Sequence, residues 1–107
     1  MQKFTPDAIK GTTEYGGNVK IIVSKAIGSQ LNSGIFSLAP GEALVKDVHE
    51  NDEVFYIIDG TLTIDNPEQQ TVTANAGEMV LIPKEEVHFS KNLGDKTVKI
   101  FWCHIAP

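Results

Sequence analysis

Residues 41–60 read GEALVKDVHENDEVFYIIDG, which is two runs with strand character on either side of a polar turn. Asp47 and His49 stand two apart in the first run, so strand alternation would point both side chains to the same face. Residues 50–52 supply turn formers, and Glu53 opens the second run. The hairpin should therefore bring one imidazole and two carboxylates together. Polar groups on a buried face are costly unless something satisfies them, and a bound metal ion would do so.

A second stretch, residues 77–92, adds another imidazole. Residues 77–83, GEMVLIP, read as a short buried strand that ends at a proline, and the next strand opens close to His88. The candidate ligands are then Asp47, His49, Glu53 and His88. Two nitrogens and up to two carboxylate oxygens suit Fe(II), Mn(II) or Ni(II), with Zn(II) possible. The absence of thiolates argues against a structural zinc site.

The first stretch resembles the first motif of the cupin superfamily, whose members are small antiparallel β-barrels with a metal in the barrel. That motif is a glycine, five residues, His-x-His, three or four residues, a glutamate, six residues and a second glycine. Its positions are occupied here by Gly41, Asp47, His49, Glu53 and Gly60. Every spacing holds, and Asp47 in place of the first histidine is the departure.

The second stretch resembles the second cupin motif: glycine, five residues, Pro-x-Gly, two residues, histidine, three residues and asparagine. Its positions are occupied by Gly77, Pro83, Glu85, His88 and Asn92. Glu85 replaces the second glycine, and a glutamate tolerates a positive φ poorly. The resemblance gives Asn92 a structural role in bracing this motif.

The rest of the chain agrees with an all-β fold. Short strand-like runs follow one another at regular spacing with turn signals between them, which is typical of a sandwich or barrel. The cupin resemblance implies an antiparallel double-stranded β-helix, or jelly-roll barrel. At 107 residues the chain has room for one domain, residues 1–107, with residues 1–17 as an N-terminal lead-in.

Composition argues against several partners. A formal charge of −5 disfavours nucleic acid and anionic membranes, because both need clustered positive charge. All nine basic residues are lysines, so the arginine fork that usually captures phosphate is missing, and a small carboxylic acid is a better substrate than a phosphorylated one. Met1 to Pro6 lack the apolar run of a signal peptide. The single cysteine, Cys103, fits a reducing cytoplasm.

The last expected strand, residues 96–105, is apolar on both faces. One face carries Val98, Ile100, Trp102 and His104, and the other carries Lys99, Phe101, Cys103 and Ile105. One face would fill the barrel and the other would pack on a neighbouring sheet or subunit. Dimers formed by sheet packing are frequent among small cupins, so the resemblance implies a homodimer.

Two of the candidate residues have more than one interpretation. Asp47 would ligate the metal directly, hydrogen-bond His49 or a water beside it, or mark a cupin that has lost its metal. His104 is the one catalytic candidate, as a proton-transfer group near the metal, and the competing interpretation is an ordinary core or rim residue.

Two functional hypotheses follow from these residues. The first is a mononuclear metal-dependent cupin enzyme of dioxygenase, decarboxylase, isomerase or lyase type. Its substrate would be a small carbonyl or carboxylate compound that coordinates through oxygen. The second is a non-catalytic cupin that binds a metal or a small ligand. The fold does not choose between these chemistries.

Overall fold

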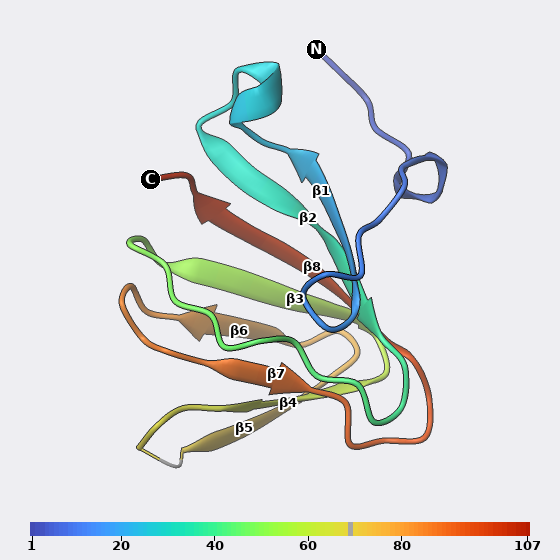
Figure 1. Cartoon of the computed structure of the whole chain (residues 1–107), viewed down its shortest axis with the longest axis vertical. Coiled ribbons are helices and arrows are strands. Elements are labelled where there is room, and N and C mark those ends of the chain that lie inside the picture. Colours follow the sequence, from blue (N-terminus) through green and yellow to red (C-terminus); the bar gives the residue numbers. More distant parts are fainter. Residues whose placement is uncertain (69) are drawn as a thin grey trace.

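The computed structural model describes residues 1–68 and 70–107, and its regular secondary structure is almost all β-strand (Figure 1). The strands are β1 (Asn18–Val23), β2 (Leu31–Leu38), β3 (Glu53–Asp59), β4 (Thr61–Asp65), β5 (Thr71–Asn75), β6 (Met79–Ile82), β7 (Phe89–Lys91) and β8 (Val98–Ile105). The helical elements in this part of the chain are single 3-10 turns at Pro6–Ala8 and Lys25–Ile27. Neither turn is long and apolar enough to cross a membrane.

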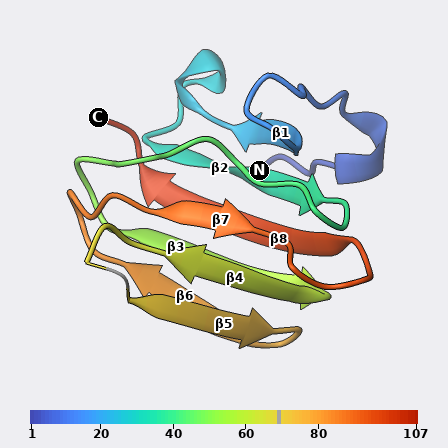
Figure 2. The same ribbon diagram turned by 60° about the horizontal axis from the view of Figure 1, so that its bottom comes forward.

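The strands form two antiparallel sheets that face each other. The larger has the order β1-β2-β8-β3-β6, and the smaller has the order β5-β4-β7. Figure 2 shows the smaller sheet in front of β3, β6 and β8. The chain therefore folds as the antiparallel jelly roll that its sequence predicts, with the two layers enclosing one interior.

The core lies between the sheets because the inward residues of nearly every strand are apolar. Buried and exposed residues alternate along β8, as the period of two predicts. The face that carries Trp102 and His104 is therefore the one that points inward, a choice that the sequence left open. The buried apolar side chains come from both sheets and are Val19, Phe36, Leu38, Phe55, Ile57, Leu62, Ile64, Ala74, Ile82, Val98, Ile100 and Trp102.

Gly60 lets the chain pass from the larger sheet to the smaller. β3 ends at Asp59 and β4 begins at Thr61, so the whole change of direction falls on one residue. The φ of Gly60 is +80°, and a Cβ there would lie 2.9 Å from the carbonyl oxygen of Thr97. Both facts restrict the position to glycine.

Residues 42–49 do not form the regular strand that the sequence predicts. The segment meets β7 and the residue before it through two isolated bridges, Ala43 with Lys91 and Asp47 with His88. Between the bridges, the amide of Val45 donates to the carbonyl of Tyr15 at 2.9 Å and not to β7. The two bridges are one residue out of register with each other, so a bulge interrupts the ladder between them, and the prediction of a regular strand was wrong.

Asn92 has the bracing role that the cupin resemblance implies. Its side chain is buried, and its amide donates to the carbonyls of Leu38 at 2.9 Å and Lys96 at 2.7 Å. Its side-chain oxygen accepts the Gly94 amide at 2.9 Å. The side chain therefore connects the end of β2 to the loop that leads into β8. Both polar atoms of its amide group are hydrogen-bonded, as buried polar atoms usually are.

The outer side of the larger sheet is also apolar. Antiparallel sheets usually turn polar residues toward water, but exposed apolar side chains here cover β2, β8, β3 and β6. Strand register places them side by side, with Tyr56 opposite Met79 on one neighbour and Phe101 on the other. We call this surface the outer apolar face; its exposed members are Leu31, Tyr56, Ile58, Met79, Leu81, Phe101 and Ile105.

Cys103 lies within the outer apolar face and is half-buried. Burial raises the pKa of its thiol, with a further contribution from the charge of Glu53. A thiol with a raised pKa is a poor nucleophile at neutral pH. These features suit a small hydrophobic residue.

Glu85 is the non-glycine residue with a positive φ, 65°, among those described. It stands where the second cupin motif has glycine, so the turn keeps its left-handed geometry although the side chain is unsuited to it. The amide of Glu85 donates to the carbonyl of His49 at 2.7 Å. This hydrogen bond connects the turn to a candidate ligand and helps to hold the residue in its unfavourable conformation.

Glu85→Gly should stabilise the protein. A left-handed conformation costs an ordinary residue roughly 1–2 kcal/mol, and glycine loses about 0.5–1 kcal/mol through its more flexible unfolded state. The net gain should be about 0.5–1 kcal/mol, which corresponds to a rise in Tm of roughly 3–5 °C. Thermal unfolding by circular dichroism measures it. The neighbouring Glu86→Gly is the control and should lose stability; equal effects of the two substitutions would contradict the strain at Glu85.

Candidate metal centre

Three side chains from separate segments converge at one end of the space between the sheets. Glu53 begins β3, His88 directly precedes β7, and His49 lies four residues before Glu53. Nε2 of His49 is 3.3 Å from Oε1 of Glu53, and Nε2 of His88 is 3.2 Å from the same oxygen. Glu53 and His88 are only 4% and 3% exposed, so the carboxylate has little access to water. The residues that the two motifs single out therefore lie together.

Two of these atoms are close but do not hydrogen-bond. Nε2 of His49 and Oε1 of Glu53 are buried, and neither has a partner of acceptable hydrogen-bond geometry among residues 1–68 and 70–107. Leaving such atoms unsatisfied is costly. Lone pairs that approach without bonding each other are suited to a shared cation. Imidazole nitrogen and carboxylate oxygen are donors that first-row divalent metals accept, so these residues fit a metal ion.

The site's carboxylates and imidazoles shift one another's pKa values. Asp47, and then Glu53, raise the pKa of His49 to about 10. Burial alone would raise the pKa of Glu53, but its two histidine neighbours outweigh burial and hold it below its ordinary value. Burial lowers the pKa of His88, whereas Glu53 raises it, and the net shift is upward. The ionised carboxylates thus attract positive charge, either protons on the imidazoles or a metal ion that displaces those protons.

Asp47 lies at the rim of the site. Its Oδ2 is 3.2 Å from Nε2 of His49, while its Oδ1 accepts the Val48 amide at 2.8 Å. Its side chain is 53% exposed, and the contact with His49 lowers its pKa although partial burial acts in the opposite direction. One donor atom each from Asp47, His49 and His88 lie within 4.8 Å of one another. This position is compatible both with direct ligation and with a bond to His49.

His104 also belongs to this group of residues. Its ring stacks on that of His49, with centroids 4.0 Å apart and planes inclined by 24°. One donor atom each from His49, Glu53 and His104 lie within 4.8 Å of one another. All three histidines of the chain therefore meet at one place. The sequence placed His104 on the same face of the last strand as Trp102 but could not predict its distance from the other two histidines.

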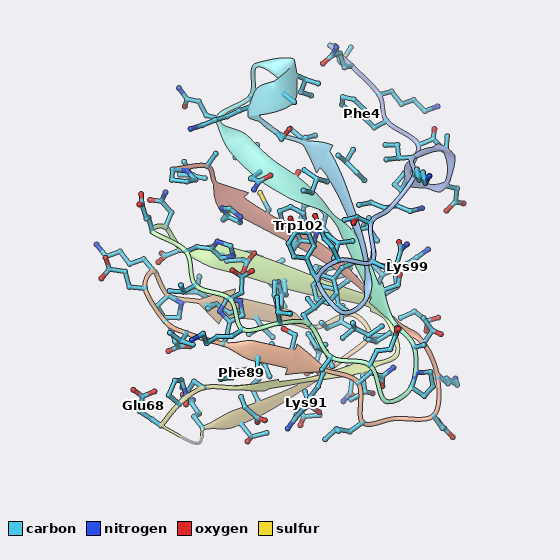
Figure 3. The ribbon with its side chains drawn as sticks, in the orientation of Figure 1. Phe4, Glu68, Phe89, Lys91, Lys99 and Trp102 are labelled. Atoms are coloured by element: carbon cyan, nitrogen blue, oxygen red, sulfur yellow. The ribbon has the colours of Figure 1, made fainter. Side chains whose placement is uncertain are left out.

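The site opens into a cavity of about 340 Å³. Its apolar wall includes Phe36, Phe55 and Trp102, and Figure 3 shows Trp102 directed from β8 into the space between the sheets. Ile57, two residues along β3 from Phe55, is not part of this wall and belongs to the fully buried core. The indole Nε1 of Trp102 is buried and without a hydrogen-bond partner in the described part of the chain.

Polar residues that the sequence did not single out also line the cavity, among them Asn32 and Tyr15. Asn32 belongs to β2 and lines the cavity opposite His104. Tyr15 comes from the N-terminal lead-in, which reaches the cavity through the hydrogen bond between its carbonyl and the Val45 amide. Neither residue has a local pattern that would have revealed its position.

The model of a family described as the cupin domain matches residues 34–104 of this chain. The match covers most of the chain and contains His49, Glu53, His88 and His104. The chain belongs to the cupin family. A search of curated proteins finds no match for this cupin.

Solved structures share its fold at low sequence identity. A predicted oxalate decarboxylase from Thermotoga maritima superposes with a TM-score of 0.83 at 20% identity, covering 99% of this cupin and 100% of that chain. The polyketide cyclase RemF from Streptomyces resistomycificus also gives 0.83, at 19% identity, over 100% of this chain and 82% of that one. A cupin-2 domain containing protein from Shewanella frigidimarina is 26% identical with a TM-score of 0.65, over 82% and 79% of the two chains.

His88→Ala should abolish metal retention by this cupin while leaving the barrel folded. The substitution removes one of the two imidazoles in contact with Glu53 and should cost the metal-free protein on the order of 1–3 kcal/mol. Elemental analysis after desalting measures retention, and circular dichroism reports the fold. Ser90→Ala is the matched control, since Ser90 is also buried and lines the same cavity. Full metal occupancy in His88→Ala would exclude His88 as a ligand.

Proposed function

We propose that this cupin is a mononuclear metal-dependent enzyme that acts on a small carbonyl or carboxylate compound. The observation that carries the proposal is the pair of buried, unpartnered atoms, His49 Nε2 and Glu53 Oε1, 3.3 Å apart beside His88. His49, Glu53 and His88 would hold the ion, with Asp47 as a further candidate at the rim. Fe(II), Mn(II) or Ni(II) suits these donors best, and Zn(II) is compatible with them.

The residues around the site provide binding, orientation and exclusion of water. The ion, when bound, would supply Lewis acidity or activation of oxygen. Phe36, Phe55 and Trp102 form an apolar wall that excludes water from the substrate's non-coordinating part. The inward position of His104 beside His49 supports its role as a residue that takes part in the chemistry, which the sequence suggests as proton transfer.

Cavity size and charge support a small substrate. A volume of about 340 Å³ is near the lower end of the range for small-molecule sites. With no arginine in the chain, recognition of an anion would depend on the metal and on a lysine such as Lys46, which lines the cavity. Both features favour a small carboxylate or carbonyl compound over a nucleotide-sugar. Dioxygenase, decarboxylase, isomerase and lyase reactions all remain compatible, because the fold alone does not select one.

The proposal is tested by metal content, thermal stability and ligand binding. Protein freed of metal by a chelator should gain stability when Mn(II), Fe(II), Ni(II) or Zn(II) is added. At 100 times the dissociation constant the gain is about 2.7 kcal/mol, or a rise in Tm on the order of 10 °C. The preferred metal form is then screened against small mono- and dicarboxylic acids and dicarbonyl compounds, with the fluorescence of Trp102 as readout. His88→Ala should respond to neither metal nor acid.

A non-catalytic cupin that binds a small ligand is the second candidate function. Asp47 in place of the first motif histidine favours it, because that change removes one nitrogen from the usual cupin ligand set. Protein isolated with substoichiometric metal, and with a Tm that ignores all four added metals, would support this function and contradict the first.

We also propose that this cupin is a cytoplasmic homodimer that pairs through the outer apolar face. That face spans four strands, and its exposed apolar side chains, with Met79 and Leu81 at 66% and 61% exposure, lie side by side across them. Single exposed apolar residues are common on monomers, but a contiguous patch of this size is not. A second copy presents the same apolar surface, so two copies can bury it against each other around a two-fold axis.

Leu81→Glu should shift the protein from dimer to monomer. Leu81 is 61% exposed on β6, and a carboxylate there would be buried without a partner in the paired sheets. Sedimentation equilibrium at several concentrations measures the shift, which should weaken association at least ten-fold. Leu93→Glu is the control, because Leu93 is 70% exposed but lies in the loop before β8. A wild-type protein that is monomeric throughout would contradict the proposal.

A further inference from the structure

His104 is held in the site from two neighbouring strands. It is 5% exposed on β8, and the strand register pairs it with Glu53 of β3 on one side and Asn32 of β2 on the other. Its ring stacks on His49 and lies 5.8 Å from the ring of Trp102. The side chain is therefore fixed between candidate ligands and the cavity wall, in contrast to the half-exposed side chain of Asp47.

The hydrogen bonds of His104 determine which nitrogen is free. Nδ1 lies 3.1 Å from the carbonyl oxygen of Ile105, which can only accept, so Nδ1 carries the proton. In the neutral imidazole the lone pair is then on Nε2. The contact of Nε2 is with the amide nitrogen of Asn32, a donor, at the long distance of 3.4 Å. Nε2 is thus a weakly engaged acceptor at the edge of the site.

His88 shows the same arrangement. Its Nδ1 lies 3.1 Å from the carbonyl of Glu86, which leaves Nε2 directed at Glu53. A metal-ligating histidine usually donates its other nitrogen to a carbonyl or carboxylate, which sets both tautomer and ring orientation. In both His88 and His104, a backbone carbonyl binds Nδ1 and leaves Nε2 free to accept a metal ion. Asp47 has no oxygen left free in this way, because one oxygen accepts the Val48 amide and the other contacts His49.

We propose that His104 is a metal ligand and that it supplies the nitrogen lost where Asp47 replaces the first motif histidine. The set would be His49, Glu53, His88 and His104, with Asp47 outside it at the rim, where its Oδ1 accepts the Val48 amide. Donor atoms of His49, Glu53 and His104 already lie within 4.8 Å of one another, so side-chain adjustments on the order of 1 Å would bring them to metal–ligand distances of about 2.0–2.2 Å. This role replaces proton transfer as the function of His104, and it rests on the proposed metal site.

The test compares His104→Phe with Asp47→Asn, using metal alone as the probe. Phenylalanine keeps a ring stacked on His49 but has no nitrogen. Ni(II) affinity is measured by competition with a chelator, and quenching of Trp102, the single tryptophan, follows binding directly. His104→Phe should weaken Ni(II) binding on the order of 10–100-fold, whereas Asp47→Asn should weaken it less than about 3-fold.

Electron paramagnetic resonance of the Cu(II) form counts the nitrogens around the ion. Three coupled imidazoles are expected in the wild type and in Asp47→Asn, and two in His104→Phe. Only two coupled imidazoles in the wild type would overturn the assignment of His104 as a ligand while leaving the metal site intact. A larger loss of Ni(II) affinity in Asp47→Asn than in His104→Phe would do the same. A wild type that binds neither metal would overturn both proposals. If His104→Phe does not fold without metal, His104→Gln decides by the same readouts.

Discussion

The buried carboxylate of Glu53 is the constraint that the residues of the candidate metal centre have to satisfy. Glu53 is 4% exposed at the start of β3, between β6 and β8 in the larger sheet. An ionised carboxylate in such a place is stable only with positive charge beside it. His49 and His88 stand at 3.2–3.3 Å and hold the Glu53 pKa below its ordinary value, so the charge is kept and not neutralised. A site built in this way binds protons or a metal, and the two compete.

The two histidines next to Glu53 reach it through different parts of the fold. His88 is positioned by the bridge to Asp47, which joins the smaller sheet to residues 42–49. The carbonyl of His49 accepts the amide of Glu85, whose strained turn precedes His88 by three residues. The two cupin motifs are thus linked by backbone hydrogen bonds close to the site. Local strain at Glu85 is retained in a turn that orients the site, which is where such strain is commonly found.

The larger sheet separates two apolar environments with different uses. Its inner face provides the core and the cavity wall, including Phe36, Phe55 and Trp102. Its outer face carries Tyr56, Met79 and Phe101 in register, with nothing in the described chain to cover them. Alternation along each strand makes the two faces independent, so one sequence segment contributes to both. Residues of β8 therefore serve the site at even positions and the outer apolar face at odd positions.

The sequence by itself determined the fold class, the strand breaks and the residues around Glu53. Strand alternation and turn residues are local, and the spacing of the two motifs leaves few ways to fold, so the jelly roll and the proximity of His49, Glu53 and His88 could be predicted. Tertiary structure alone decided the rest. Residues 42–49 do not form a regular strand because their pairing with the segment 88–91 shifts register by one residue between the Ala43–Lys91 and Asp47–His88 bridges. His104 lies in the site because strand register pairs it with Glu53 on one side and Asn32 on the other. Asp47 lies at the rim, with its side chain half-exposed. Register and long-range hydrogen bonds depend on which strands become neighbours, and a local pattern does not contain that information.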